Sequence, residues 1–391
     1  MRILVVLTYY RPHTSGLTIY AERLAKALVR RGHQVTVLTS QYDKTLALEE
    51  ECEGVKVMRV PVSFRISKGV IMPKFGLTAT RLVKQHDVIQ LHLPQFDAAG
   101  VALRGRLSKK PTVITYHCDL LLPHGVISWA ANQAVKLMNT LAATFTHRIV
   151  TYTQDYAENS SYLRRYMDKL QTILPPVELP VASPEEIRQF AFQHNPLGKK
   201  PVIGMAARFA TEKGVEILLD ALPKVLEKQP DAQVWFAGPY QNILGEQEYA
   251  ARLMPRIHKY EKAGTWHFMG TLDPAAMAAY YPNLDVHVLP SLNSTEAFGL
   301  VQIEAMMNGV PCVASNLPGV RRPVQMHQMG EVVPIGDSTT LGEAINKILA
   351  DPAQYRQDPR EVASHYIPDQ VAREYEQLFE NLLKDLHNGR K

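Results

Sequence analysis

Short apolar runs alternate with amphipathic stretches along the whole chain. Residues 3–7 are all apolar, and in residues 17–31 apolar side chains recur every three or four positions with arginines and a lysine between them. The first pattern predicts a buried strand and the second predicts an amphipathic helix. Residues 35–38 then predict another strand. A strand, a helix and a strand in succession predict a parallel pair with a right-handed crossover.

The same alternation continues through both halves of the chain. In the first half, strands are predicted at residues 55–60, 87–92, 112–117 and 148–152, and a long apolar-rich helix at 124–146. In the second half, strands are predicted at residues 201–206, 232–236, 266–270, 286–289, 310–315 and 330–334. Prolines at 175, 176 and 180 indicate a connector, so we place a domain boundary within residues 175–198. The fold class is therefore α/β, with two Rossmann-like parallel-sheet domains over residues 1–178 and 199–368, facing a central cleft, and an amphipathic helix within 369–391.

The composition is typical of a globular protein of a reducing cytoplasm. Of 391 residues, 46% are apolar and 21% are charged, and the three cysteines are far apart, without the spacing of a zinc site or a disulfide framework. The apolar start is too short for a signal peptide, and no run of about 20 apolar residues predicts a transmembrane helix. We therefore predict a cytoplasmic location.

Charge is unevenly distributed along the chain. Residues 1–170 hold 23 lysines and arginines against 12 acidic residues, whereas the remainder holds 20 against 26. Residues 54–86 contain seven cations and no acidic residue, with phenylalanine, isoleucine and methionine among them. Such a segment is typical of a membrane surface contact, although a solvated surface gives the same pattern. The first half therefore favours an anionic partner: a membrane, a lipid phosphate or a polyanion.

Two glutamates, Glu296 and Glu304, bracket the junction between a polar loop and a helix that begins near Gly299. Free N–H groups at a helix N-terminus favour an anion such as phosphate, and carboxylates can accept hydrogen bonds from hydroxyls. Phosphate and hydroxyls together describe a nucleotide sugar. His92 and His117 each end a predicted strand, where ligands bind in an open parallel sheet, although a structural role is the common alternative for a histidine.

Three groups of residues match a known family. Glu296 and Glu304 are separated by seven residues, within the longer pattern Pro290, Ser291, Phe298, Gly299, Leu300, Ala305, Met306, Gly309, Val310 and Pro311. The second group is Arg208 with Glu212, Lys213 and Gly214, and the third is Gly16 with residues 30–35. With these motifs the chain resembles the retaining glycosyltransferases of family 4, which have the two-domain GT-B fold. The resemblance covers nearly the whole chain in the right order.

The resemblance implies a nucleotide-diphosphate sugar as donor, held mainly by the second domain. It implies that Glu304 contacts the ribose, that Glu296 faces the donor sugar, that Arg208 and Lys213 bind the diphosphate, and that His117 lies near the transferred sugar. Further donor contacts are implied for main-chain amides near Phe298, Gly299 and Leu300, for Gly16, and for Gly270 and Thr271 near the base. The family needs no metal or other cofactor, and its C-terminal helix crosses back to the first domain. No nucleic-acid partner is expected.

The acceptor region is predicted in the first domain. Arg65 and Lys68 of the basic segment, together with His92, are the acceptor candidates. The hypothesis is a peripheral membrane enzyme that glycosylates a lipid-linked or saccharide acceptor in envelope or exopolysaccharide assembly; a soluble acceptor is the alternative. The chain departs from the family where Ser15 precedes Gly16, since adjacent glycines are usual there, and also at residues 174–176 and 318–322.

Three other functions are compatible with parts of the pattern. A glycoside hydrolase would use Glu296 and Glu304 as its two carboxyls, but it would leave Arg208 and Lys213 without a purpose. A nucleotide-sugar epimerase of the same fold would not need the pattern from Glu296 to Leu300. A non-catalytic two-domain ligand-binding protein is the third. A dinucleotide site is not predicted, because no Gly-x-Gly-x-x-Gly follows the first strand.

Overall fold

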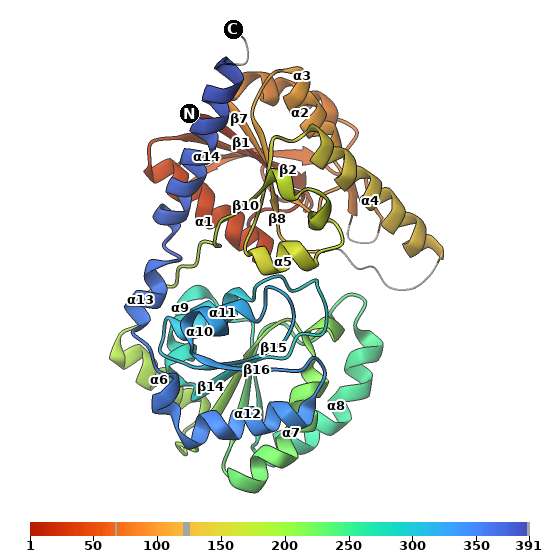
Figure 1. Cartoon of the computed structure of the whole chain (residues 1–391). Coiled ribbons are helices and arrows are strands. Elements are labelled where there is room, and N and C mark those ends of the chain that lie inside the picture. Colours follow the sequence, from red (N-terminus) through yellow and green to blue (C-terminus); the bar gives the residue numbers. More distant parts are fainter. Residues whose placement is uncertain (67–68, 120–125, 389–391) are drawn as a thin grey trace. The chain divides into compact units, whose positions relative to one another are not determined.

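The computed structural model describes residues 1–66, 69–119 and 126–388 (Figure 1). It divides into two compact units. Unit 1 consists of Met1–Pro176 together with Tyr366–Lys391, and unit 2 consists of Val177–His365. Each unit contains an α/β sheet, which confirms the fold class predicted from the alternation.

Unit 1 contains an eight-stranded sheet in the order β10-β9-β8-β7-β1-β2-β4-β3. The strands are β1 (Arg2–Val6), β2 (Gln34–Gln41), β3 (Glu49–Cys52), β4 (Val55–Pro61), β7 (Val88–Leu93), β8 (Thr112–Tyr116), β9 (Arg148–Thr151) and β10 (Leu170–Thr172). Neighbours run parallel, except that β3 pairs antiparallel with β4. The chain moves outward on one side of β1 and then returns to β7 on its other side. The order therefore reverses between β1 and β7, which is where open α/β sheets bind ligands.

The composition of the basic segment 54–86 indicates one continuous surface stretch, but the structure does not show one. It divides into β4, a small hairpin of β5 (Phe64–Ile66) and β6 (Gly69–Ile71), and the helix α2 (Phe75–Gln85). Most of β4 is buried within the sheet, and its Arg59 is buried too, with its charge paired to Glu50 at 2.6 Å. Pairing with Glu50 lowers the free-energy cost of burying the Arg59 cation. The burial of the apolar side chains of β4 outweighs the cost that remains.

The helices of unit 1 include one from the far end of the chain. They are α1 (Gly16–Arg30), α2, α3 (Ala98–Leu107), α4 (Val126–Phe145), α5 (Gln154–Asn159) and α14 (Pro368–Asn388). α14 lies beside α1 (Figure 1). Arg31 Nε donates to Glu376 at 2.8 Å, and the hydroxyls of Tyr20 and Tyr375 are 2.7 Å apart. The last helix of the chain is thus part of the first unit.

Unit 2 contains a six-stranded parallel sheet in the order β13-β12-β11-β14-β15-β16. The strands are β11 (Val202–Ala206), β12 (Gln233–Ala237), β13 (Trp266–Gly270), β14 (Val286–Leu289), β15 (Cys312–Ser315) and β16 (Gly330–Val333). The helices are α6 (Pro184–His194), α7 (Val215–Lys228), α8 (Gln247–Lys262), α9 (Pro274–Tyr280), α10 (Leu300–Met306), α11 (Arg322–His327), α12 (Ser338–Ala350) and α13 (Pro359–Ser364). Here the order reverses between β11 and β14, so these two strands flank the ligand-binding position of the sheet.

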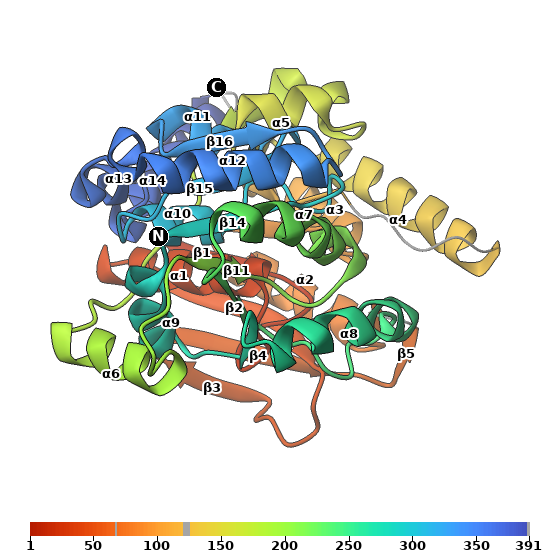
Figure 2. The ribbon, with the colours of Figure 1, turned by 90° about the horizontal axis from the view of Figure 1, so that it is seen from below.

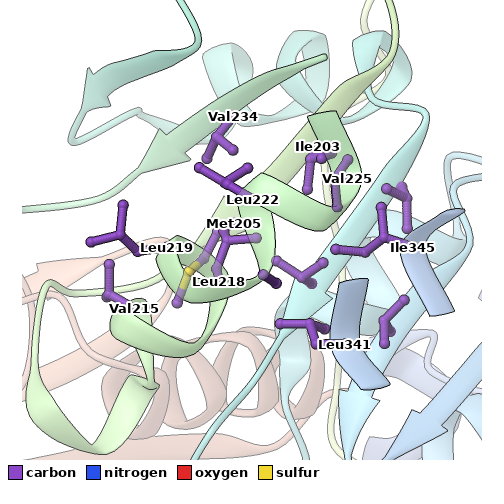
Figure 3. Packing of buried hydrophobic residues seen from close by; sticks show 14 of the residues in the cluster. Ile203, Met205, Val215, Leu218, Leu219, Leu222, Val225, Val234, Leu341 and Ile345 are labelled. Atoms are coloured by element: carbon purple, nitrogen blue, oxygen red, sulfur yellow. The ribbon is translucent and has the colours of Figure 1, made fainter. Parts of the chain in front are cut away.

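The core of unit 2 fixes the strands that carry the candidate site. α12 lies beside α7 (Figures 1 and 2). Leu218 and Leu222 of α7 and Leu341 of α12 are fully buried against Met205 of β11 and Val234 of β12 (Figure 3). The apolar residues of α7 recur at helical spacing, so one face of the helix meets the sheet. Each large apolar side chain buried in this way contributes about 1.5–3 kcal/mol.

Candidate active site

Two loops meet at the carboxyl ends of β11 and β14. The first comprises residues 207–214, including a short 3₁₀ turn (Thr211–Lys213), and the second comprises residues 290–299. Leu292 N donates to Glu212 O at 2.9 Å. Gly214 has φ +66°, and a Cβ added there would lie 2.1 Å from Pro290 O. Only glycine allows this close approach, so the backbones of the two loops are held together at this point.

Two ion pairs lie on these loops. Arg208 is paired with Glu212 within the first loop. Lys213 Nζ lies 2.5 Å from Glu296 Oε2 and joins the two loops, and these two side chains are only 21% and 17% exposed. Burial acts to lower the pKa of Lys213, but the attraction of Glu296 outweighs it and leaves that pKa raised. The two cations and two carboxylates of these pairs balance, so an incoming diphosphate would compete with carboxylates for the cations.

Glu304 lies inside the unit, on α10, and is 8% exposed. Its Oε2 accepts a hydrogen bond of 2.9 Å from the hydroxyl of Tyr281. Burial and the adjacent Glu304 carboxylate raise the pKa of Tyr281, so that hydroxyl stays protonated and remains a donor. Glu304 is therefore a fixed acceptor. Tyr281 was not predicted as a site residue, because it comes from the preceding part of the chain and matches no motif.

The start of α10 differs from the expected anion-binding helix end in one respect. The helix has only seven residues, so its dipole is smaller than that of a long helix. Gly299 precedes it with φ +81°, and a Cβ there would lie 2.3 Å from Leu289 Cδ2. Phe298 is buried, and its carbonyl accepts from Gln302 Nε2 at 3.0 Å. Leu300 is the first helical residue. Arg208 and Lys213 on the touching loops add positive charge to that of this short helix.

Gly270 and Thr271 lie at the same edge of the sheet. Gly270 ends β13, and its carbonyl accepts from Gly238 N at 2.7 Å, which joins the ends of β13 and β12. A Cβ added to Gly270 would meet nothing within 4 Å, so open space lies beside it. Thr271 is exposed. Their assignment to the base stays a prediction.

The predicted residues of unit 1 lie in different surroundings. Gly16 is the first residue of α1, and Ser15 caps that helix, since its Oγ accepts from Thr18 N at 3.2 Å. A serine therefore has a use at the position where the family often has a second glycine. Arg65 is exposed on β5 and donates to the carbonyl of Tyr42. Lys68 lies outside the described residues.

His92 and His117 are in contact and are both buried, at 1% and 6% exposure. His92 Nδ1 lies 2.8 Å from His117 Nε2, and His117 Nδ1 is hydrogen-bonded to the hydroxyl of Tyr152. Burial lowers the pKa of His92 to about 3, and burial together with His92 lowers the pKa of His117. Both rings are neutral at physiological pH. His92 thus contacts His117 within unit 1, and its assignment to the acceptor stays a prediction.

Neither a metal site nor a membrane span is found in the described parts of the chain. No group of three His, Cys, Asp or Glu side chains there could hold a metal ion. No helix there is both long and apolar enough to cross a membrane.

Comparison with known families decides what this site belongs to. The model of the glycosyl transferase 4-like domain matches residues 15–175, and that of the glycosyl transferases group 1 matches residues 186–365. The chain belongs to the family-4-like glycosyltransferases. The predicted enzyme class is thereby confirmed.

Relatives of this glycosyltransferase cover nearly its whole length. It is 26% identical over 355 residues to phosphatidyl-myo-inositol mannosyltransferase of Mycobacterium leprae, covering 89% of this chain and 87% of the relative. It is 28% identical over 385 residues to glycogen synthase of Mycobacterium tuberculosis, covering 90% and 87%. The crystal structure of Anabaena HepE in complex with UDP has a TM-score of 0.77 at 20% identity, covering 97% of this chain and 100% of HepE. This last likeness confirms the GT-B fold.

Proposed function

We propose that this glycosyltransferase moves a hexose from a nucleotide-diphosphate sugar to an acceptor hydroxyl with retention of the anomeric configuration. The observation that carries the proposal is the pair of touching loops in unit 2, which place Arg208 and Lys213 beside carboxylates at the position where the strand order reverses. Charge-assisted hydrogen bonds from such cations suit a diphosphate. HepE, which has this fold, is known in complexes with UDP and with UDP-glucose, and this supports a nucleotide-sugar donor.

Each side chain then has a defined task. As the bond between the sugar and the diphosphate breaks, negative charge grows on the leaving diphosphate, and Arg208 and Lys213 stabilise it. Glu296 is freed from part of its pairing with Lys213 and accepts a hydrogen bond from a sugar hydroxyl. Glu304, which Tyr281 holds in place, accepts from the ribose. Arg208 and Lys213 supply the positive charge that a divalent metal would otherwise supply, so we propose that the reaction is metal-independent.

A donor panel tests the proposal. The purified chain is incubated with UDP-, GDP- and ADP-hexoses, with and without EDTA, and the anomer of the product is read by NMR. We expect transfer or slow donor hydrolysis with at least one donor, also in the presence of EDTA. The product should have the anomeric configuration of the donor sugar. Glu296→Gln should abolish it. An inverted product, a requirement for added metal, or full activity in Glu296→Gln would contradict the corresponding part of the proposal.

We propose further that the acceptor is lipid-linked and that unit 1 contacts an anionic membrane surface. α2 and α3 carry Arg81, Lys84, Arg104 and Arg106 and contain no acidic residue. Leu77 of α2 and Leu107 of α3 are 78% and 75% exposed on the same two helices. Cations with exposed leucines favour the surface of an anionic bilayer. The relative from Mycobacterium leprae is named for a phospholipid substrate, which supports this choice.

Vesicle sedimentation tests the membrane contact. Vesicles containing an anionic phospholipid should retain the chain at low salt and release it at high salt. Leu77→Ser with Leu107→Ser should weaken retention, whereas Leu197→Ser, an exposed leucine of unit 2, should not. Retention that is absent, or equal on neutral vesicles, would exclude this proposal and leave the sugar-transfer proposal standing.

A further inference from the structure

We propose that His92 is a positioning residue for His117: it holds one ring nitrogen of His117 while Tyr152 holds the other. The inference rests on the proposed function and on the prediction that His117 lies near the transferred sugar, and it adds two residues to which the family motifs assign no such role. Both are on strand ends of unit 1, with His92 on β7 and Tyr152 directly after β9. His117 follows β8, which lies between those two strands.

The three side chains form a hydrogen-bonded row across the sheet. His92 Nδ1 lies 2.8 Å from His117 Nε2, and the planes of the two rings are within 19° of each other. His117 Nδ1 is bonded to the hydroxyl of Tyr152. The main chain of His117 is anchored as well, since its N–H donates to Leu93 O at 3.0 Å. A ring held at both nitrogens has one orientation. Because both nitrogens are engaged within unit 1, the row fixes the position that the ring and main chain of His117 present to a nearby sugar.

The row also selects a tautomer for His117. A neutral imidazole has one N–H donor and one acceptor nitrogen, so His117 must donate at one end and accept at the other. His92 Nε2 is buried and finds no hydrogen-bond partner among the described residues. An unpaired acceptor is tolerated better than an unpaired buried N–H. His92 therefore carries its proton on Nδ1 and donates to His117 Nε2, and His117 in turn donates from Nδ1 to Tyr152.

A second set of contacts closes the space around this row. The ring of Tyr20 meets His117 edge-on, with centroids 4.9 Å apart. The hydroxyl of Tyr20 is 2.7 Å from that of Tyr375 on α14, and the latter is 2.9 Å from Thr115 Oγ1. The C-terminal helix α14 thus supports the ring of Tyr20, against which His117 packs. Burial of all these groups keeps water from competing for the ring nitrogens.

Three substitutions at position 92 separate positioning from packing. His92→Leu removes the nitrogen and keeps most of the volume. His92→Asn places a polar atom where Nδ1 was, whereas His92→Gln places it nearer to the position of Nε2. We expect His92→Leu and His92→Gln to lower kcat by about 10–100-fold, the range seen when the partner that orients a metal-ligating histidine is removed, with donor KM little changed. His92→Asn should recover most of kcat.

Ring nitrogen NMR gives a readout that does not need turnover. With ¹⁵N-labelled histidine, and with the His117 signals assigned by their loss in His117→Gln, the wild type should show one tautomer with Nδ1 protonated. His92→Leu should show a mixture or the other tautomer. Tyr152→Phe removes the hydroxyl that holds Nδ1 of His117. Its control is Tyr162→Phe, which removes another buried hydroxyl of unit 1, one that donates to Asn139 O. The control should leave the His117 signals unchanged.

The outcomes are distinguishable from those of the proposed function. Unchanged His117 signals in His92→Leu, or equal losses of kcat in His92→Asn and His92→Gln, would overturn the positioning role. Full activity in His117→Gln would instead overturn the prediction that His117 lies near the transferred sugar, and no transfer from any donor would overturn the proposed function. The NMR comparison would still decide how His92 acts on His117.

Discussion

At the scale of single residues, the ion pair of Lys213 with Glu296 joins the two loops of the proposed donor site, and we expect donor turnover to depend on it. Lys213→Met should lower kcat by about 10²–10³-fold, the usual loss when a group that stabilises developing charge is removed. It also leaves Glu296 without its partner at 2.5 Å. Initial rates over a range of donor concentrations measure the effect.

The double variant Lys213→Met with Glu296→Gln is the informative control for this contact. Because the two side chains are in contact, the loss in the double variant should be smaller than the sum of the two single losses and close to that of Glu296→Gln alone. Strictly additive losses would show that the two side chains act separately, and that the ion pair of the free enzyme has no part in donor binding.

His287 gives a prediction about stability and pH. It is fully buried on β14, and neither ring nitrogen has a partner in the described structure. Burial lowers its pKa from 6.5 to about 3. Between these values the unfolded chain binds a proton that the folded chain does not, so this residue makes the folded state less stable as pH falls below 6.5. Between pH 7 and pH 5 the loss is about 2 kcal/mol.

His287→Leu should therefore flatten the decline in stability between pH 7 and pH 5 by about that amount. At pH 7 it should be neutral or stabilising by about 1 kcal/mol, because two unpaired polar atoms are replaced by apolar ones. Urea unfolding at the two pH values measures both effects. An unchanged pH dependence would mean that His287 is protonated, or has a partner, in the folded protein.

Individual residues of the site could be predicted where a motif fixes their spacing, and their partners could not. Glu296 and Glu304 stand out because they flank a polar loop and a helix start, and Arg208 and Lys213 because they match the phosphate-binding loop of the family that the chain resembles. The hydroxyl that holds Glu304 comes from Tyr281, in an earlier turn of the chain. Nothing local distinguishes that tyrosine from its neighbours, since only the folded sheet brings the two together.

At the scale of elements, Gly214 is the residue that lets the two site loops touch. Gly214→Ala should both disfavour φ +66° and push a methyl group into Pro290 O, moving Lys213 away from Glu296. Gly336 has φ +75° with nothing within 4 Å of a Cβ, so Gly336→Ala carries only the backbone cost, about 1–2 kcal/mol. Thermal unfolding should show a lower Tm in both variants than in the wild type.

Donor KM separates these two glycine variants. Donor KM should rise by tenfold or more in Gly214→Ala, because Lys213 is displaced, and stay within twofold in Gly336→Ala. A tenfold rise corresponds to about 1.4 kcal/mol of lost donor binding. Equal KM values in the two variants would show that contact between the loops is not needed for donor binding.

Elements with strong apolar periods were predicted well, and those without them were missed. β13 and β14 have the predicted bounds, because each is a short apolar run between turn residues. β3 has the sequence EEEC and is exposed, so no hydrophobic pattern marks it, and its pairing with β4 alone defines it. α6 lies within the stretch assigned to a connector. Its capping box, Ser183 with Glu186, was the local signal that the nearby prolines obscured.

At the scale of the whole molecule, the order of the chain does not follow the order of the units. Unit 1 is interrupted by unit 2 and is completed by residues 366–391. Alternating strands and helices predicted two α/β domains, and the topology of each sheet agrees with that. Local patterns carry no information about which sheet the last helix joins. Its partners on α1 are more than 300 positions away in sequence, as with Tyr20 and Tyr375.

Removal of the chain after His365 should therefore unfold unit 1 and leave unit 2 folded. α14 buries Val371, Tyr375, Leu378, Phe379 and Leu382. At about 1.5–3 kcal/mol each, these side chains contribute up to roughly 8–15 kcal/mol, which is comparable to the whole stability of a domain. Calorimetry of the truncated chain should show one transition fewer than the full chain, and proteolysis should degrade residues 1–176 first. Gln377→Ala, on the exposed face of α14, should change neither result. If the truncated chain kept both transitions, α14 would be an accessory of unit 1, and its Tyr375 could not be what supports Tyr20 against His117.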